Sequence, residues 1–215
     1  MYHSQYDDYA WMSKFGDTGF VYHAAAGRIA AAMALRVANA DVLPYDYVEF
    51  ARTMRRYLPP IDRSFAEKRW NIETDGAGPV PTALLRSAID RMEESAASFA
   101  RARDAALAAT PSRSAVEATN RALMRVERAL TRPEGLRTRP WFRNLIYVAD
   151  ENNGYANMAL PSVNEAIRTG DVSLTRREIA DLAARFDEAT RALVEARNAI
   201  SVAPSSAPPR RPPLR

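Results

Sequence analysis

Apolar residues recur at helical spacing through most of this chain of 215 residues. Over three long segments they fall three or four positions apart on one face, which is the pattern of amphipathic helices with one buried side. Between about residues 81 and 109 the face comprises Leu85, Ile89, Met92, Ala96 and Phe99. Over 114–130 it comprises Val116, Leu123, Val126 and Leu130. Over 175–202 it comprises Ile179, Leu182, Phe186, Ala189, Leu193, Ala196 and Ile200.

Shorter helices are expected closer to the N-terminus. Asp17 is a suitable N-cap for a helix over 17–38, which is rich in small residues that allow close packing. A second helix starts at Asp46 and ends before the Pro59-Pro60 pair, because proline cannot donate a hydrogen bond within a helix. Its apolar face comprises Val48, Ala51, Met54 and Leu58. A further short helix is expected over 61–70.

The segments between the helices carry turn and strand signals. Residues 73–81 form a loop by composition, and residues 145–148 resemble a short strand that the loop 150–155 follows. Capping-box spacing marks three helix starts, with the pairs Asp46–Glu49, Ser114–Glu117 and Thr175–Glu178. The sequence therefore predicts that one long non-helical excursion interrupts the succession of helices.

The predicted fold class is mainly α, with an antiparallel arrangement that resembles a four-helix bundle. Residues 1–16 are aromatic and polar without clear periodicity, so they do not fit this bundle. The tail 203–215 is too poor in large apolar residues to fold and is expected to be disordered.

Composition excludes several classes of function. The chain has no cysteine, so disulfides and cysteine-ligated zinc are ruled out, and its two histidines, His3 and His23, cannot build a multi-histidine metal site. The formal net charge is +4, but the tail 203–215 supplies three of those charges, so nucleic-acid binding is not expected. The sequence shows neither a signal peptide nor a membrane-spanning segment and predicts a soluble chain of undetermined compartment.

A resemblance to a known family extends over about residues 1–200. The N-terminal stretch YHSQYDDYAWMSKFGDTGFVYHAAAGRIAAAMALRVANADVLPYDY resembles the end of the peptidase domain in the glutamate carboxypeptidase II and transferrin receptor family, the dinuclear-zinc M28-type peptidases. The motifs NRALMRVERALTRPEGL, RPWFRNLIYV and NNGYA then follow in the order of the family's helical, transferrin receptor-like dimerisation domain. The resemblance implies three regions: a peptidase-domain remnant (1–43), a dimerisation domain (44–202) and the tail (203–215).

The resemblance also implies site residues. A histidine in a Tyr-His-Ser context is the last protein ligand of a two-zinc centre in the family's peptidases, and that position matches His3. The preceding tyrosine, which helps to hold substrate, matches Tyr2. A loop tyrosine that binds the terminal carboxylate of the peptide substrate matches Tyr155. Without the family, the alternatives are an exposed His3 with no ligand role and a Tyr155 that merely packs its loop.

Two departures from the family limit what this chain can do alone. The family's other zinc ligands and its catalytic glutamate lie upstream of the matched segment, so no complete catalytic site and no bound zinc are expected here. Gly154 stands where glutamate-preferring members have a lysine, which places a preference for acidic C-terminal residues in doubt. Met1 remains open to interpretation as an internal methionine, a mispredicted start or the true start of a split gene.

Three hypotheses of function follow. The leading one is a homodimeric dimerisation module of a glutamate carboxypeptidase-like zinc peptidase, catalytically incomplete in this chain. The alternative is the C-terminal part of an active zinc-dependent carboxypeptidase, in which a missing peptidase portion supplies the remaining ligands and a peptide is bound only after assembly. The third is a helical adaptor that binds partners through its Pro/Arg tail, 203–215.

Other polar and aromatic residues have plainer interpretations. His23 is expected to be a packed or surface histidine, and the Asp7-Asp8 pair is expected to cap or solvate a turn rather than bind metal. The Trp141-Phe142 pair is assigned to an interdomain core. The apolar face over 175–202 is expected to form core, with flanking positions available to a second subunit.

Overall fold

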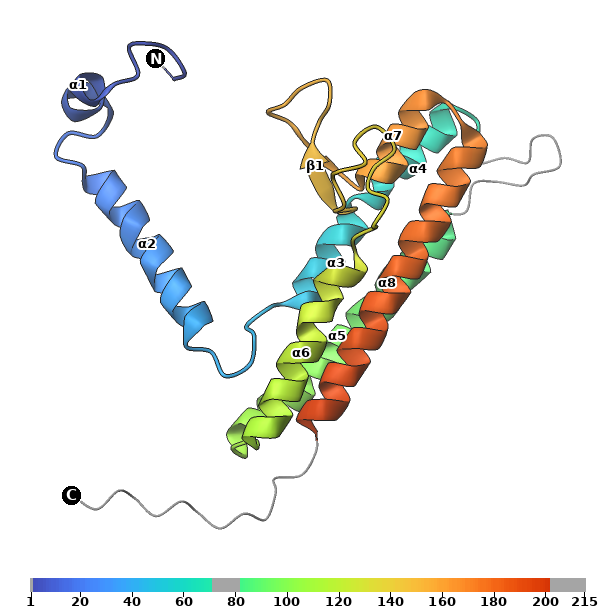
Figure 1. Cartoon of the computed structure of the whole chain (residues 1–215). Coiled ribbons are helices and arrows are strands. Elements are labelled where there is room, and N and C mark those ends of the chain that lie inside the picture. The colour runs from blue at the N-terminus through green and yellow to red at the C-terminus, as the bar shows by residue number, and fades with distance from the viewer. Residues whose placement is uncertain (1, 71–81, 202–215) are drawn as a thin grey trace, which may run out of the picture. The chain divides into compact units, whose positions relative to one another are not determined.

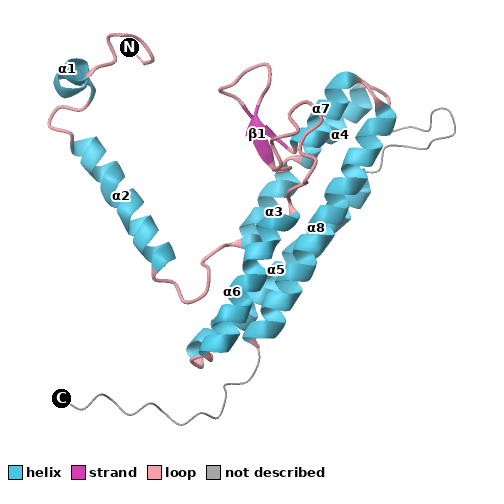
Figure 2. Cartoon of the chain, in the orientation of Figure 1, coloured by secondary structure: helices cyan, strands magenta, loops and turns pink. Residues whose placement is uncertain are grey.

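The computed structural model describes residues 2–70 and 82–201 and divides into two compact units, Met1–Pro44 and Tyr45–Arg215 (Figure 1). Helices dominate both units, which confirms the mainly α fold class (Figure 2). Two predictions, the loop over 73–81 and the disordered tail over 203–215, fall wholly outside the described residues. None of the helices in the described part of the chain combines the length and apolar character that a bilayer crossing requires.

The first unit consists of short helical turns followed by one long helix. α1 (Tyr9–Trp11) leads into the π-helix η1 (Met12–Gly16), and α2 (Val21–Ala38) follows. Not one residue of α2 is buried. Its exposed large apolar side chains are Val21, Tyr22, Ile29, Met33, Leu35 and Val37. Within this unit, α2 therefore has no core to pack against.

The start of α2 differs from the prediction, because Asp17 is not its N-cap. The helix begins at Val21, after Phe20 adopts a left-handed backbone conformation with φ of 57°. The turn that precedes the helix nevertheless brings the Asp17 carboxylate to the helix end. Its Oδ1 accepts the backbone N–H of Tyr22 at 3.1 Å, and its Oδ2 accepts that of His23 at 2.8 Å. Asp17 thus satisfies two helix N–H groups from outside the helix.

The second unit is a helical bundle in which α8 occupies a central position. Its long elements are α3 (Tyr47–Arg56), α4 (Leu58–Glu67), α5 (Thr82–Ala108), α6 (Arg113–Ala129) and α8 (Val172–Ile200). α8 packs against both α5 and α6, and α3 packs against α5 (Figure 1). The second unit thus buries the apolar faces that the sequence predicts.

The bundle is not antiparallel throughout. Ion pairs show that α3 and α4 run against α5, and that α6 and the residues just after it run against α8. These pairs are Arg52–Glu93, Arg86–Asp62, Arg125–Glu195 and Arg132–Glu178. Because a short connection reverses the chain between α5 and α6, α5 and α8 lie side by side in the same direction.

The core consists of the apolar faces read from the sequence. Every predicted face residue of α5 and α8 is buried, whereas Val48 on α3 and Val116 on α6 are only partly buried. α3 ends at Arg56, and the Pro59-Pro60 pair lies in the first turn of α4, where a missing N–H breaks no helical hydrogen bond. Helical periodicity therefore predicted the core better than it predicted the helix ends.

Besides Asp17, one predicted N-cap is correct and two are displaced. Asp46 caps α3 and accepts the N–H of the residue three positions on, at 2.9 Å, as expected. α6 is capped by Ser112 rather than Ser114, and α8 is capped by Asp171 rather than Thr175. Each observed cap is a polar residue with extended backbone that directly precedes its helix. Thr175 lies inside the first turn of α8, where its hydroxyl donates to the Asp171 carbonyl at 2.8 Å.

The excursion between α6 and α8 contains a small hairpin and a helix. β1 (Tyr147–Ala149) and β2 (Asn157–Ala159) pair antiparallel, with Val148 opposite Met158. The predicted strand 145–148 therefore begins two residues and ends one residue too early, and neither β2 nor α7 (Pro161–Thr169) was predicted. α7 packs against α8 and β2, so it links the hairpin to the bundle.

Two residues of the connection before β1 are informative. Gly135 has φ of 68°, and a Cβ at this position would lie 2.1 Å from the Pro140 carbonyl oxygen, so only glycine fits this close approach. Trp141, assigned to an interdomain core, is 77% exposed and touches Phe142 edge-on at 5.7 Å between ring centroids. Trp141 therefore does not form part of the core of this unit.

Candidate functional site

The predicted residues Tyr2 and His3 form an exposed aromatic pair at the start of the first unit. Their rings stack at 3.9 Å between centroids with an interplanar angle of 19°. His3 has a left-handed backbone (φ of 57°), and its N–H donates to the Asp7 carboxylate at 3.3 Å. Asp8 caps α1 by accepting the Trp11 N–H at 2.8 Å. The Asp7-Asp8 pair thus organises turns, as expected.

The second histidine is held by a carboxylate. His23 Nδ1 lies 2.5 Å from Asp17 Oδ2, and because the carboxylate can only accept, Nδ1 carries the hydrogen. Burial opposes ionisation of Asp17, but the hydrogen bonds from the His23 side chain and from the backbone of His23 and Tyr22 outweigh it and lower the pKa of Asp17. His23 therefore has a structural role in closing the end of α2.

The described residues contain no cluster of side chains with the number of donors that a zinc ion needs. Within residues 2–70 and 82–201, no group of three or more histidine, aspartate or glutamate side chains converges on a common point. A neutral imidazole such as that of His3 suits zinc, but zinc sites in proteins use at least three protein ligands. His3 could therefore contribute to such a site only if ligands from another portion of a protein joined it.

The other predicted site residue, Tyr155, lies in the second unit at the tip of the β1–β2 hairpin. Its side chain is 74% exposed, and its backbone N–H donates to the Asn153 side-chain oxygen at 3.2 Å. Gly154 precedes it, with open space where a side chain would project. The tip residues 150–156 include two acids and no lysine or arginine. An exposed phenol beside amide groups can hydrogen-bond a carboxylate, but this tip offers no cation of its own.

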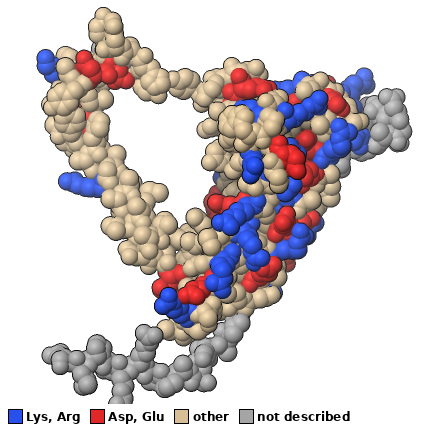
Figure 3. Space-filling model, viewed as in Figure 1, with Lys and Arg blue, Asp and Glu red and all other residues tan. Residues whose placement is uncertain are grey.

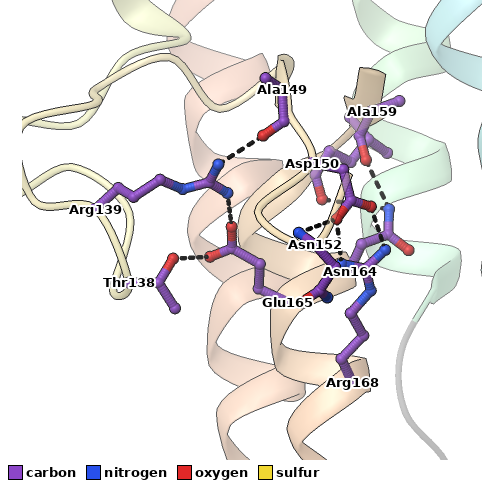
Figure 4. A network of polar contacts seen from close by, with 10 residues as sticks. Thr138, Arg139, Ala149, Asp150, Asn152, Ala159, Asn164, Glu165 and Arg168 are labelled. Atoms are coloured by element: carbon purple, nitrogen blue, oxygen red, sulfur yellow. Dashed lines mark hydrogen bonds and ion pairs between the residues drawn. The ribbon is translucent and has the colours of Figure 1, made fainter. Parts of the chain in front are cut away.

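A network of polar contacts joins the root of the hairpin tip to α7 (Figure 4). Arg168 on α7 forms a bidentate pair with Asp150, the first residue of the tip, and its Nη1 lies 3.0 Å from Oδ1. Arg139 donates to the Ala149 carbonyl at 2.6 Å and pairs with the buried Glu165 of α7. Two ion pairs therefore hold neighbouring positions of the chain where β1 ends.

The charge state of the tip root follows from these pairs. Hydrogen bonds from Arg168, together with the N–H of Asn152, lower the pKa of Asp150 to about 2. The same pair, with contributions from Glu151 and Glu165, raises the pKa of Arg168. Because the pKa of Asp150 is lower in the folded state than in the unfolded chain, its contribution to stability is complete above about pH 4 and is lost as the pH falls through about 2.

Sequence reasoning did not identify this network. Glu165 and Arg168 lie three positions apart on α7, which places them on one face of that helix. A signal for α7 exists, because Pro161 occupies its first position and Gly170 follows its last with φ of 75°. The pairing of Asp150 with Arg168 depends on how the hairpin folds back, and no local pattern indicates it.

A comparison with known families assigns most of the second unit. Residues 80–194 match the transferrin receptor-like dimerisation domain, a stretch that contains α5, α6, the hairpin, α7 and most of α8. Because the match covers more than half of the 215 residues, the chain belongs to this family. The resemblance derived from the sequence is confirmed.

Curated relatives extend the match beyond that domain. The probable glutamate carboxypeptidase LAMP1 of Arabidopsis thaliana is 30% identical over 167 residues, which cover 78% of this chain and 22% of that protein. The probable glutamate carboxypeptidase VP8 of Zea mays is 28% identical over 180 residues, covering 83% and 24%. The inactive zinc metalloprotease C354.09c of Schizosaccharomyces pombe is 26% identical over 186 residues, covering 85% and 23%. The chain therefore spans less than a quarter of the length of these relatives.

Proposed function

We propose that this chain is the dimerisation and interaction module of a glutamate carboxypeptidase-like zinc peptidase and is catalytically incomplete by itself. The observation that carries this proposal is the contrast between its two units. The second unit buries a complete core and matches a dimerisation domain. The first exposes the whole of α2, whose surface is almost free of charge, whereas charges of both signs cover the bundle (Figure 3).

The charged residues of α2 are Arg28 and Arg36 alone, and a helix with so many apolar side chains on its surface is normally buried against another element. The relatives that this chain matches are about four times longer than the match, and two of those described above are named as glutamate carboxypeptidases. We therefore assign residues 1–43 to the last segment of a peptidase domain, with α2 packed against a portion outside this chain. Residues 44–202 form the dimerisation domain in this proposal.

Homodimerisation is the first property to test. A two-fold dimer has the same surface on both subunits, so it needs no second gene product. Light scattering on the full chain should give about twice the chain mass of 23.9 kDa. A monomer at the highest soluble concentration would contradict the dimerisation role. Hydrolysis of peptides by the isolated chain, with two bound zinc ions, would contradict its catalytic incompleteness.

A second candidate function is carboxypeptidase activity in an assembled protein. Its support is the Tyr2–His3 pair at one end of the chain and an exposed Tyr155 on the hairpin tip, which match family positions for zinc and substrate binding. In the assembled protein, His3 would hold zinc together with ligands from the peptidase portion. Because Gly154 replaces a cation and the tip carries no lysine or arginine, no preference for acidic C-terminal residues is expected.

Reconstitution tests this second function. The peptidase portion of the LAMP1 relative, fused ahead of Tyr2, should give zinc-dependent hydrolysis of peptides that a chelator abolishes. His3→Ala should then lower the rate of peptide hydrolysis at least about 100-fold, because a protein zinc ligand is lost. The control is Tyr6→Phe in the same exposed segment, which should change activity less than twofold. Full activity of His3→Ala would rule out the ligand role.

A further inference from the structure

The tip of the β1–β2 hairpin is an ordered loop rather than a loose connection. Three backbone hydrogen bonds close it: Asp150 N–H to the Ala156 carbonyl at 2.8 Å, Asn153 N–H to the Asp150 carbonyl at 3.2 Å, and Ala156 N–H to the Asn153 carbonyl at 2.9 Å. Asp150 takes part in two of them, and its side chain accepts the Asn152 N–H at 2.9 Å. Asn153 likewise takes part in two of them, and its side chain accepts the Tyr155 N–H at 3.2 Å, so Asp150 and Asn153 together shape the tip.

The same residue joins the tip to the bundle. Its carboxylate, only 12% exposed, pairs with both terminal nitrogens of Arg168. Bidentate pairs of this kind fix orientation as well as distance, because the planar guanidinium matches the carboxylate. Arg168 belongs to α7, which packs on α8. The Asp150–Arg168 ion pair thus links the tip to α7 and, through α7, to the bundle.

A second attachment lies one residue away. The Ala149 carbonyl accepts from Arg139, and Arg139 is held in turn by Glu165 on the same face of α7 (Figure 4). Thr138 donates to the other oxygen of Glu165 at 3.1 Å. The end of β1 is consequently held through the Ala149 backbone carbonyl, which Arg139 contacts, and the tip is held through the Asp150 side chain, which Arg168 contacts. Of these two contacts, the Asp150–Arg168 pair is the one made by a residue of the tip itself, 150–156, which includes Tyr155.

We propose that Asp150 is a positioning residue, whose pair with Arg168 holds the hairpin tip so that Tyr155 is presented in one fixed place to the terminal carboxylate of a peptide. The part that concerns the peptide rests on the proposed carboxypeptidase function, whereas the fixing of Tyr155 does not. A preordered loop binds with less loss of conformational entropy than a mobile one. The Arg168 guanidinium is already paired with Asp150. Tyr155 and the neighbouring amides are therefore the groups of the tip that can hydrogen-bond the terminal carboxylate of the peptide.

The first test uses the full chain alone. Asp150→Asn keeps an oxygen that can accept the Asn152 N–H but removes the charge that pairs with Arg168. Amide exchange at Asn153 and Ala156 should then accelerate roughly fivefold or more, since a charge-assisted bidentate contact is lost. The backbone order parameter of Tyr155 should fall from near the rigid value of about 0.85 to below about 0.6.

Two further variants make this test specific. Glu151→Gln removes the neighbouring acid of the tip and should leave exchange and order unchanged. Arg168→Lys keeps the positive charge but loses the bidentate geometry of the guanidinium, so the exchange rates and the Tyr155 order parameter should take intermediate values. If Asp150→Asn leaves the Tyr155 order parameter and the tip exchange rates as they are in the unsubstituted chain, the positioning role is wrong.

The second test uses the reconstituted peptidase. Asp150→Asn should raise KM for a peptide about tenfold while kcat changes less than twofold, because the loop affects binding and not the reacting bond. In a Tyr155→Phe background, Asp150→Asn should raise KM little further, because both substitutions affect the same contact. The matched control is Tyr147→Phe on β1. If Asp150→Asn accelerates amide exchange in the tip but leaves KM unchanged, the proposed role of Asp150 in substrate binding is wrong. Loosening in a reconstituted protein that never cleaves peptides would instead reject the carboxypeptidase function and leave the fixing of Tyr155 intact.

Discussion

Phe186→Ala is expected to lower the free energy of unfolding of the second unit by about 3–5 kcal/mol. Phe186 is fully buried on α8, the helix that packs against both α5 and α6. Truncation removes a large apolar side chain and leaves a cavity that rigid helices on two sides cannot close. Urea denaturation followed by circular dichroism measures the effect, at one protein concentration so that association does not alter it.

The matched control for this substitution is Phe15→Ala. Phe15 is 75% exposed in the first unit, so its truncation should change stability by less than about 0.5 kcal/mol. A loss below about 1 kcal/mol for Phe186→Ala would contradict the central position of α8. In the reconstituted peptidase, by contrast, Phe15→Ala should weaken assembly if the first unit packs on the peptidase portion as proposed.

The long helices of the bundle could be predicted because burial imposes its own period on the sequence. All seven face residues predicted on α8 are buried, since a helix of 29 residues repeats the pattern often enough to leave no ambiguity. α2 shows the opposite limit. Its small and apolar residues predict a helix correctly, but none of its residues is buried, and a helical pattern does not specify what packs against the helix.

Short elements and ends were harder to predict. β2 has three residues and α7 nine, and neither is long enough for its period to stand out. The caps of α6 and α8 were displaced because several polar residues precede each helix, and only backbone conformation selects Ser112 or Asp171. Local patterns therefore located these elements only to within a few residues.

For the candidate site, the resemblance supplied His3 and Tyr155, whose roles stay predictions. The structure adds the residues around them: Asp17 beside His23, and Asp150 with Arg168 at the hairpin root. These pairs join residues that are 6 and 18 positions apart. Such contacts depend on tertiary folding, so residue spacing in the sequence does not reveal them.

Glu165→Met is the second substitution with a large expected effect, a loss of about 3–5 kcal/mol in the free energy of unfolding. Glu165 is 6% exposed and Arg139 has a side chain 15% exposed, so removing the acid leaves a guanidinium charge with little solvent to compensate it. Nε of Arg139 is buried without a hydrogen-bond partner among the described residues. The remaining contacts of this side chain therefore cannot offset the loss of Glu165.

A double variant separates lost pairing from lost packing. In Arg139→Met/Glu165→Met both charges are gone, and stability should return to within about 1–2 kcal/mol of the original, because apolar residues of similar volume can replace a buried ion pair. Glu195→Met is the control on the exposed pair with Arg125, and should cost less than about 1 kcal/mol. If Glu165→Met costs no more than this control, or if the double variant is as unstable as the single one, the Arg139–Glu165 pair does not hold the hairpin against α7. With Arg139→Met added as the other single variant, the same urea denaturation series gives the coupling energy between the two side chains.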